Sequence, residues 1–343
     1  MAGDLLKRIR SSKEKVLAAL NRTIGVVPII PLSITHSATL LGIKIPAMRR
    51  DAKLNVEAQV KAWEKYRYDG IVVYSDMGMF WESMGGKIKL SEDSFPSQEP
   101  MLARLEDAER LNFPDLEKEG SLKETLRALE GINDKVGEEV AVLIDMVAPF
   151  TFAGALRGMD LFMMEIVRKP DLAENLLTRC HDFLIAYVDE LKRRGALIIV
   201  FADPMASLIR PSMYERFALP YQKSILQKIR ANGMYSVLHI CGDTTAILGE
   251  MGTSGSDCLG LDHRVDLKYA RKMVGSLCLK GSVDPIGTLL RGSVDDVERE
   301  ARKCIEDAAE GGGFILSAGC GIPAKTSSEN MEALVRVARS HSP

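Results

Sequence analysis

Two short stretches far apart in the sequence carry side chains that could bind a metal. Residues 235–245 read Tyr-Ser-Val-Leu-His-Ile-Cys-Gly-Asp-Thr-Thr, an apolar run that leads into His239 and Cys241 after a helical pattern ending at Gly233. The run predicts a buried strand, in which His239 and Cys241 project together because side chains two apart share a face. An imidazole beside a thiol is half of a zinc site, although such a pair alone also fits a packed histidine and an inert buried cysteine.

The second stretch, residues 313–323, supplies a further thiol. It reads Gly-Phe-Ile-Leu-Ser-Ala-Gly-Cys-Gly-Ile-Pro and predicts another strand, which ends at Cys320 between two glycines. Cys320 lies 79 positions after Cys241 (320 minus 241), so the sulfurs meet if both strands belong to one closed barrel and both ligands sit at the same end. His239, Cys241 and Cys320 would then offer one nitrogen and two sulfurs, which zinc prefers over the oxygens preferred by magnesium and calcium.

Three protein ligands and one open position are typical of a catalytic rather than a structural zinc site. Zinc with two thiolate ligands is a mild Lewis acid that can hold an incoming thiol as a nucleophilic thiolate. Activation of water is the other use of such an ion, but the sequence shows no obvious carboxylate to act as its general base. The remaining cysteines lie in helix or strand patterns and are expected in the core: Cys180, Cys258, Cys278 and Cys304.

Polar side chains also follow most of the other predicted strands. They are His36, Asp76, Asp203, Asp262 with His263, and Asp284. In a parallel barrel the carboxyl ends of all strands meet at one rim, where the active site lies. We therefore predict catalytic roles for Asp76 and Asp203 and cofactor-binding roles for His36 and Asp262. Each also has an ordinary explanation as a turn former, a helix cap or a loop histidine, and Asp262 is in addition a candidate for a fourth metal ligand.

About eight apolar strands alternate with helical patterns along the chain. The strands are expected over residues 26–33, 70–76, 139–145, 196–202, 235–241, 257–262, 276–282 and 313–320. Pro28 and Pro31 mark the first as a strand that donates few ladder hydrogen bonds. The alternation predicts a (β/α)8 TIM barrel. The main rival is an open doubly wound sheet, but no glycine-rich phosphate loop follows a strand to support it.

A single barrel domain over residues 1–343 is expected, with an N-terminal helix over residues 1–22. Capping boxes at Ser11 and Ser121, each followed by a glutamate three residues later, predict two helix starts. Residues 77–120 form a long connection with several glycines and prolines, and such connections in compact domains are usually functional. We therefore expect a cap-like insertion over the mouth of the barrel.

The composition fits a soluble, cytoplasmic protein. Of the 343 residues 46% are hydrophobic, enough for one large domain or two ordinary ones, and the formal net charge is −2. Acidic and basic residues are interspersed, so no basic stripe indicates nucleic-acid binding, and no apolar run of about 18 residues could span a membrane. The six cysteines include no Cys-x-x-Cys pair, which fits a reducing compartment without a disulfide framework.

On these residues the chain resembles the uroporphyrinogen decarboxylase superfamily over nearly its whole length, and within it the branch of methylcobamide:coenzyme M methyltransferases and related corrinoid methyltransferases. The most specific motifs are Tyr74-Ser75-Asp76, His239-Ile-Cys241-Gly242, Gly281-Ser-Val-Asp-Pro285 and Gly319-Cys320-Gly321-Ile322-Pro323. The resemblance implies a barrel fold and zinc bound by the His-x-Cys pair and the late cysteine. It also implies methyl transfer from a methylated corrinoid (cobalamin), carried on a separate protein that docks over the barrel mouth, to a small thiol such as coenzyme M.

The resemblance leaves the direction, donor and acceptor of the transfer open. The methyl group could pass instead from a methylated substrate to the corrinoid protein, or to tetrahydrofolate, and a non-enzymatic tetrapyrrole carrier is a further alternative. Asp76 aligns with the carboxylate by which decarboxylases of the superfamily hold the pyrroles of their substrate. Decarboxylation is disfavoured, because residues 31–39 replace the arginine-rich segment Met-Arg-Gln-Ala-Gly-Arg of those enzymes and contain no arginine to grip substrate carboxylates.

Overall fold

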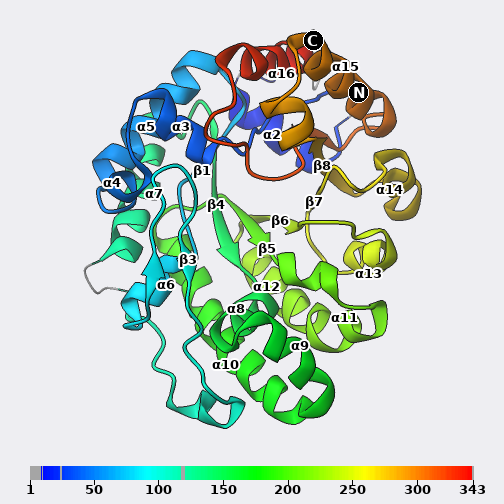
Figure 1. The fold of residues 1–343 in the computed structure, drawn as a ribbon. Coiled ribbons are helices and arrows are strands. Elements are labelled where there is room, and N and C mark those ends of the chain that lie inside the picture. The colour runs from blue at the N-terminus through cyan, green and yellow to red at the C-terminus, as the bar shows by residue number, and fades with distance from the viewer. Residues whose placement is uncertain (1–8, 10, 24, 117–119, 342–343) are drawn as a thin grey trace.

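The computed structural model describes residues 9, 11–23, 25–116 and 120–341. Seven apolar segments form its main strands: β1 (Gly70–Val73), β4 (Ala141–Val147), β5 (Ile198–Ala202), β6 (Tyr235–Ile240), β7 (Cys258–Leu261), β8 (Cys278–Val283) and β9 (Phe314–Ala318). They pair in parallel in chain order, and the resulting sheet curls with its helices on the outside (Figure 1). Parallel strands linked by helices are covered on both faces, which explains their nearly continuous apolar sequences.

Helices connect the strands, and most of them cover the outer face of the sheet. They are α2 (Ser12–Leu20), α3 (Ile34–Leu40), α4 (Ile45–Arg49), α5 (Ala52–Tyr66), α7 (Ser121–Val136), α8 (Pro149–Arg157), α9 (Met159–Arg168), α10 (Pro170–Arg193), α11 (Pro211–Phe217), α12 (Leu219–Ala231), α13 (Leu248–Gly252), α14 (Leu267–Val274), α15 (Val294–Ala308) and α16 (Ser328–His341). Short turns of other helix types are η2 (Pro204–Leu208), η3 (Thr245–Ile247) and η4 (Pro285–Leu290). Within the described ranges, no helix combines the length and apolar character needed to cross a membrane.

The first predicted strand contributes a bridge rather than a full strand. Ile29 pairs in parallel with Leu316 of β9. The Ile30 N–H donates to Leu316 O at 3.0 Å, and the Leu316 N–H donates to Pro28 O at 2.9 Å. Pro28 and Pro31 have no N–H to donate, which keeps this segment from forming a longer ladder.

The same segment is also tied to the other edge of the sheet. Asp69 directly precedes β1, and its N–H donates to Ile29 O at 2.8 Å. Its carboxylate Oδ2 accepts the Ile29 N–H at 2.9 Å, and Oδ1 accepts the Ser12 hydroxyl at 2.6 Å. The predicted (β/α)8 barrel is thus confirmed in part: seven strands form one curled parallel sheet, and residues 28–30 join its two edges.

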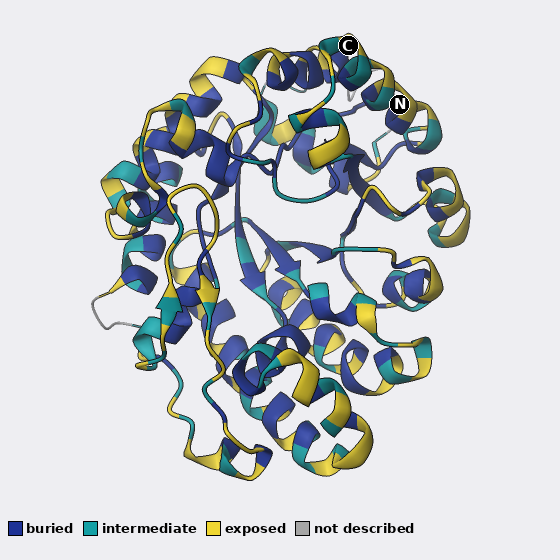
Figure 2. Ribbon diagram, in the orientation of Figure 1, coloured by how far each residue is buried: buried dark blue, intermediate teal, exposed yellow. Residues whose placement is uncertain are grey.

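Side-chain alternation along the strands separates two apolar cores. Val72 and Leu143 face the inside of the curled sheet, whereas Ile71 and Ile144 pack between the sheet and the helices. Val16 of α2 belongs to the inner core, so α2 closes the amino-terminal end of the curled sheet. In Figure 2 the strands are buried and the helices expose only their outer sides. The opposite, carboxyl-terminal end carries the polar side chains.

The segment after β1 builds part of that carboxyl-terminal end. It contains α6 (Gly78–Ser83), the antiparallel pair β2 (Ile88–Lys89) and β3 (Ser97–Gln98), and η1 (Leu105–Arg110). Figure 1 shows it, in cyan, in front of the outer helices on the left. Residues 117–119 of the predicted insertion and residues 1–8 and 10 of the predicted N-terminal helix lie outside the described part of the chain.

The two predicted capping boxes have different outcomes. The first is confirmed, because the Ser11 hydroxyl accepts the Glu14 N–H at 3.2 Å at the start of α2. The second is wrong: α7 begins at Ser121 after Gly120, without a side-chain cap. The Ser121 hydroxyl donates instead to Glu82 Oε2 at 2.6 Å, which gives it a tertiary partner in place of the local one.

Candidate metal centre and its cavities

Strands β6 and β9 bring the three predicted metal ligands together. His239 lies on β6, Cys241 directly follows that strand, and Cys320 follows β9 by two residues. His239 Nε2 lies 3.1 Å from Cys241 Sγ, which lies 3.4 Å from Cys320 Sγ. All three ligand atoms lie within 4.8 Å of one another. They meet because the carboxyl ends of the strands of one curled parallel sheet share a rim.

A backbone carbonyl of the neighbouring strand orients the imidazole. His239 Nδ1 lies 2.9 Å from Gly260 O on β7, so Nδ1 carries the proton that it donates and Nε2 presents its lone pair to the sulfurs. Gly260 makes this close approach possible, because a Cβ there would lie 3.2 Å from Nδ1. Metal-ligating histidines commonly donate their second ring nitrogen in this way.

The two sulfurs form a closely coupled pair. The hydrogen bond between them lowers the pKa of Cys320 to about 4 and, together with burial, raises the pKa of Cys241. One thiolate is therefore favoured, and a second one beside it would need a cation to offset the repulsion of two close negative charges.

The donor set fits zinc. Two sulfurs and an oriented imidazole nitrogen are the soft ligands that zinc prefers. Among the described residues, these three form the one group of three or more histidine, cysteine or acidic side chains whose ligand atoms lie close enough to hold a metal ion together. A zinc ion held by these three side chains would have room for one further ligand from a substrate, as catalytic zinc sites do.

Two cavities meet at the candidate metal centre. The outer cavity has a volume of about 660 Å³ and lies at the rim, where its wall includes the exposed side chains of Met159, Leu208 and Ile286. The inner cavity has a volume of about 410 Å³ and lies between the ends of β1 and β4, α6 and residues 95–98. Cys241 and Cys320 belong to the walls of both, so a molecule in either cavity can reach the sulfurs.

Asp262 lines the outer cavity, but its oxygens are already engaged by the protein. Oδ2 accepts the Gly242 N–H at 2.9 Å, and Oδ1 accepts the Arg264 N–H at 3.1 Å and lies 2.9 Å from His263 Nδ1. These contacts brace the residue that follows Cys241 against the end of β7. The predicted cofactor-binding role of Asp262 stays a prediction, as does its role as a fourth ligand.

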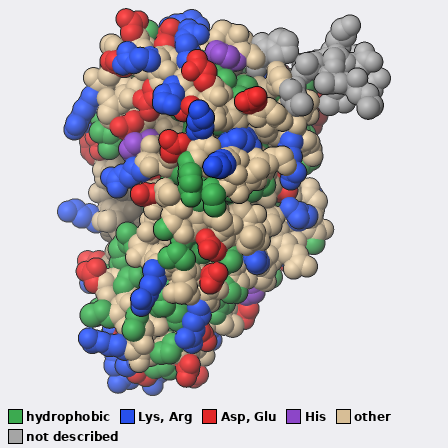
Figure 3. Space-filling model, turned by 90° about the vertical axis from the view of Figure 1, so that its right-hand side faces the viewer, with side chains coloured by type: hydrophobic (Ala, Val, Ile, Leu, Met, Phe, Trp, Pro, Cys, Tyr) green, Lys and Arg blue, Asp and Glu red, His purple; other side chains and the backbone are tan. Residues whose placement is uncertain are grey.

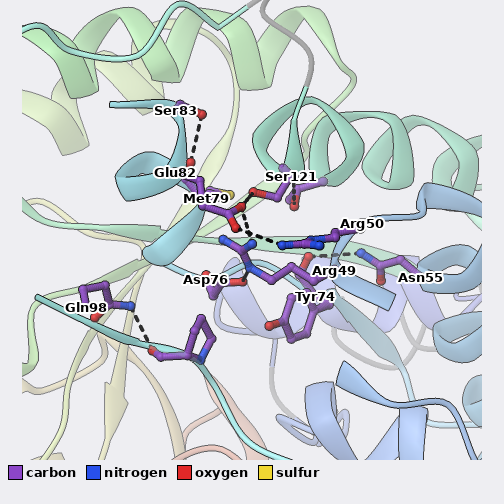
Figure 4. A network of polar contacts seen from close by, with 12 residues as sticks. Arg49, Arg50, Asn55, Tyr74, Asp76, Met79, Glu82, Ser83, Gln98 and Ser121 are labelled. Carbon is purple, nitrogen blue, oxygen red and sulfur yellow. Dashed lines mark hydrogen bonds and ion pairs between the residues drawn. The ribbon is translucent and has the colours of Figure 1, made fainter. Parts of the chain in front are cut away.

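Asp76 lines the inner cavity and forms a buried ion pair. Its Oδ2 accepts from Arg49 Nε at 2.8 Å, and 0% of the arginine and 3% of the aspartate side chain is exposed. The same guanidinium pairs through Nη1 with Glu82, which also accepts from Ser121 (Figure 4). Asp76 therefore has an internal counter-ion that ties the end of β1 to α4, and its catalytic role stays a prediction.

Asp203 lies behind the site rather than in a cavity wall. Its carboxylate is fully buried, and burial raises its pKa to about 6. Oδ1 accepts the N–H and the hydroxyl of Thr151 at 3.0 and 2.6 Å, and Oδ2 accepts Gln222 Nε2 at 2.7 Å. Thr151 itself lines both cavities. Asp203 thus holds the first turn of α8 in place, and a direct catalytic role for it stays a prediction.

His36 lies on α3 and is buried against α5 and the chain before α16. Its Nε2 lies 2.9 Å from the Tyr66 hydroxyl, and its Nδ1 lies 3.3 Å from Ala324 O. Burial lowers its pKa, which favours the neutral imidazole. His36 is absent from the walls of both cavities at the metal centre. Its predicted cofactor-binding role also stays a prediction.

Sequence reasoning missed two charged residues inside the curled sheet. Asp145 on β4 lines the inner cavity, and Lys280 on β8 is buried on the face of its strand that carries Cys278. Burial raises the pKa of Asp145 to about 6 and lowers the pKa of Lys280 to about 8. Both residues end or interrupt an apolar strand at inward positions, and this signal was available in the sequence.

Comparison with known proteins places the chain among relatives of similar length. Residues 11–341 match the family described as uroporphyrinogen decarboxylase (URO-D). The chain is 36% identical over 239 residues to the methylcobamide:CoM methyltransferase MtbA of Methanosarcina mazei, covering 69% of each protein. It is 30% identical over 336 residues to the methylcobamide:CoM methyltransferase MtaA of Methanosarcina barkeri, covering 94% of this chain and 96% of that one.

A solved structure extends the similarity to the fold. A methyltransferase from Methanosarcina mazei aligns with a TM-score of 0.87 at 27% identity, covering 97% of this chain and 99% of that one. The similarity therefore spans the curled sheet, its helices and the rim that carries the three ligand side chains. The family match and these relatives agree, and the chain belongs to the uroporphyrinogen decarboxylase (URO-D) family.

Proposed function

We propose that the protein is a zinc-dependent methyltransferase that moves a methyl group from a methylated corrinoid, carried on a partner protein, to a small thiol. The observation that carries the proposal is the meeting of His239, Cys241 and Cys320 between two cavities. The names of MtbA and MtaA, which describe methyl transfer between a methylcobamide and coenzyme M, support this class of reaction.

The residues of the site suit a transfer to sulfur. Zinc bound by the three ligands would supply a mild Lewis acid that keeps an incoming thiol in its thiolate form at neutral pH. Gly260 orients His239, and Asp262 braces the backbone after Cys241. In the transfer, the acceptor sulfur forms the new bond to the methyl carbon with its own electron pair. The cobalt–carbon bond breaks, both of its electrons stay on cobalt, which passes from Co(III) to Co(I), and the thiol proton leaves to solvent.

The outer cavity suits the approach of the corrinoid partner. We infer that residues 26–33 complete an eight-stranded barrel and that the partner covers its mouth. Met159, Leu208 and Ile286 are exposed in the cavity wall by 47%, 63% and 50%, so a partner there would bury apolar surface.

The distribution of charge gives no support to nucleic-acid binding. Acidic and basic side chains are interspersed over the face of the molecule in Figure 3, so this face has no continuous basic surface for a nucleic acid.

The internal ion pair at Asp76 argues against decarboxylation of a substrate rich in carboxylates. Arg49 is the first arginine after residues 31–39, the stretch that replaces the arginine-rich segment of the decarboxylases. Its side chain is 0% exposed, and Asp76 and Glu82 already pair with its guanidinium. It therefore has little capacity left to clamp carboxylate groups of a substrate.

Metal analysis tests the proposal directly. We expect the purified protein to bind about one zinc per chain, and we expect Cys241→Ser and Cys320→Ser to weaken zinc binding by more than the ~10–100-fold that loss of an outer hydrogen bond causes. Cys304→Ser is the matched control, because Cys304 lies in α15, away from the candidate metal centre. Zinc binding by the two ligand variants equal to that of the wild type would refute the proposal.

Turnover assays distinguish the directions of transfer. Zinc-loaded protein should demethylate a methylated corrinoid in the presence of a thiol, and the reaction should be lost in Cys320→Ser. Methylation of a reduced corrinoid by a methylated substrate would favour the reverse direction. Demethylation that needs tetrahydrofolate in place of a thiol would favour that acceptor, and tetrapyrrole binding without zinc or turnover would favour a carrier.

A further inference from the structure

Lys280 is a buried cation inside the curled sheet. Its side chain is 3% exposed, and it lies on β8 two residues after Cys278, whose side chain belongs to the inner core. Side chains two apart on a strand share a face, so Lys280 also points inward. Between described residues, no hydrogen bond or ion pair holds its ammonium group. A buried charge without a direct partner is costly unless opposite charges nearby offset the cost.

The register of the sheet places Lys280 between the strands that carry the metal ligands. It pairs with Gly260 on β7, and Gly260 pairs with His239 on β6. Because Gly260 has no side chain, no side chain of β7 separates the inward faces of His239 and Lys280 in this row. On its other side β8 pairs with β9, which leads to Cys320. Lys280 therefore lies on the part of the inner wall that connects the two ligand-bearing strands.

The charge of Lys280 acts on groups that form the candidate metal centre. Burial lowers the pKa of Lys280 to about 8, and four neighbouring acidic groups oppose this shift: Cys258, Asp145, Cys320 and Cys241. The side chain is therefore largely an ammonium at neutral pH. Two of the four groups are predicted metal ligands, so Lys280 responds to the charge of the metal centre and acts on it in return.

The proposed transfer adds negative charge to the metal centre. Two cysteine thiolates cancel the charge of a zinc ion, so an acceptor sulfur that joins them as a thiolate leaves one excess negative charge. Such a charge is unfavourable in a buried place unless a cation lies near it. Arg49 is already paired with Asp76 and Glu82. Lys280 has no such partner, so its charge is available to the bound sulfur.

We propose that Lys280 offsets the charge of the acceptor thiolate and so promotes thiolate binding at the metal centre. This inference rests on the proposed function and adds to it a residue that acts through its charge, without touching the reacting atoms. It holds for an acceptor that reaches the sulfurs from either cavity. The acceptor sulfur loses negative charge as it bonds to the methyl carbon, so Lys280 stabilises the bound thiolate more than the transition state. Loss of its charge should therefore raise KM and leave kcat unchanged or higher.

Two ligands for the open position of zinc test the inference, one that binds as an anion and one that is neutral. They are 2-mercaptoethanol, which carries its only charge on sulfur when bound, and imidazole, each titrated calorimetrically into zinc-loaded protein. Lys280→Met keeps the length of the side chain and removes its charge, so we expect it to bind 2-mercaptoethanol about ten-fold more weakly. Its affinity for imidazole should be unchanged, because a neutral ligand adds no charge to the site.

Matched variants separate the charge of Lys280 from its packing. Lys280→Arg keeps the charge and should retain most of the affinity for 2-mercaptoethanol, whereas Lys280→Gln is a second uncharged variant and should lose it. Lys272→Met is the control, because Lys272 is exposed on α14 and lines neither cavity. Circular dichroism and zinc content report whether each variant is folded and loaded. In the demethylation of methylcobalamin, KM for 2-mercaptoethanol should rise about ten-fold in Lys280→Met without a fall in kcat.

The outcomes distinguish this inference from the proposed function. Wild-type affinity for 2-mercaptoethanol in folded, zinc-loaded Lys280→Met and Lys280→Gln would overturn the inference. Equal losses of thiol and imidazole affinity, or a fall in kcat at unchanged KM, would also overturn it. Each of these results would leave the proposed function standing, whereas wild-type protein that binds neither zinc nor a thiol would overturn the proposed function itself.

Discussion

Asp203 is surrounded by protein groups and does not face a substrate-binding cavity. Three donors reach its oxygens, two from Thr151 and one from Gln222, and no part of the side chain is exposed to solvent. A carboxylate at a strand end predicts catalysis only if it opens into the active site, and the sequence does not reveal which way it points. Here the neighbouring threonine lies between Asp203 and the cavities.

Burial of Asp203 makes a signed prediction for the pH dependence of stability. Its pKa is about 6 in the folded protein and 3.8 ordinarily, so between these values the folded chain retains a proton that the unfolded chain has released. The contribution of this group is therefore fully present below about pH 4 and is lost as the pH rises through 6. Asp203→Asn resembles the protonated form at every pH.

Urea unfolding of both proteins at pH 4 and pH 7 checks this. The free energy of unfolding of the wild type minus that of Asp203→Asn should fall between pH 4 and pH 7, by on the order of 2 kcal/mol. A difference that stays constant or rises with pH would contradict the assigned shift.

The metal ligands and the charged network differ in how well the sequence predicts them. His239 and Cys241 share a strand face by simple alternation, and Cys320 follows because parallel strands end at one rim. The pairing of Arg49 with Asp76 depends on how α4 packs against the end of β1, and no local pattern specifies that contact. The sequence therefore predicts positions that follow from strand geometry, but it does not predict pairwise contacts between distant elements.

At the scale of elements, the end of β9 places Cys320 through a tight backbone contact. A Cβ on Gly319 would lie 2.4 Å from His263 N and 3.1 Å from Asp262 C, which are backbone atoms that cannot rotate away. Gly321, on the other side of the cysteine, has no atom within 4 Å of a Cβ placed there. The two glycines that flank Cys320 thus have different physical reasons to be small.

This difference gives a matched pair of variants. Gly319→Ala should push the end of β9 away from the connection after β7, destabilise the fold by about 1–3 kcal/mol and weaken zinc binding at least ~10-fold. Gly321→Ala should change neither quantity appreciably. Thermal unfolding and competition with a zinc chelator measure both effects, and equal behaviour of the two variants would show that the backbone contact at Gly319 does not position Cys320.

Helix and strand starts show where local signals succeed. Ser11 caps α2 as predicted by accepting the Glu14 N–H, whereas the Ser121 hydroxyl donates to Glu82. Seven of the predicted strands form within a few residues of their expected bounds, and the first is reduced to a bridge at Ile29 by two prolines that were visible in the sequence. A tertiary partner thus overrides the local capping contact where a partly buried carboxylate competes for the hydroxyl.

At the scale of the whole molecule, Asp69 joins the two edges of the sheet. Its carboxylate accepts from Ile29 N and the Ser12 hydroxyl, and its own N–H donates to Ile29 O.

Asp69→Ala leaves the buried Ile29 N–H unpaired and should lower the free energy of unfolding by about 2 kcal/mol. Zinc binding should be unchanged, because the candidate metal centre lies at the opposite end. Asp134→Ala, at an exposed position of α7, should stay within about 0.5 kcal/mol of the wild type. Denaturant titration compares the two, and equal stability would contradict the role of Asp69.

The seam where residues 28–30 connect β9 and β1 also bears on local opening of the native structure. Neighbouring strands elsewhere in the sheet are joined by continuous ladders of backbone hydrogen bonds. Residues 28–30 are joined to β9 by a single bridge and to the start of β1 by contacts with Asp69. Transient opening should begin at this seam, so the amide hydrogens of Ile29 and Ile30 should exchange with deuterated solvent sooner than those in the middle of β5 and β6. The rim that carries the candidate metal centre would then stay assembled while the curled sheet opens at this seam.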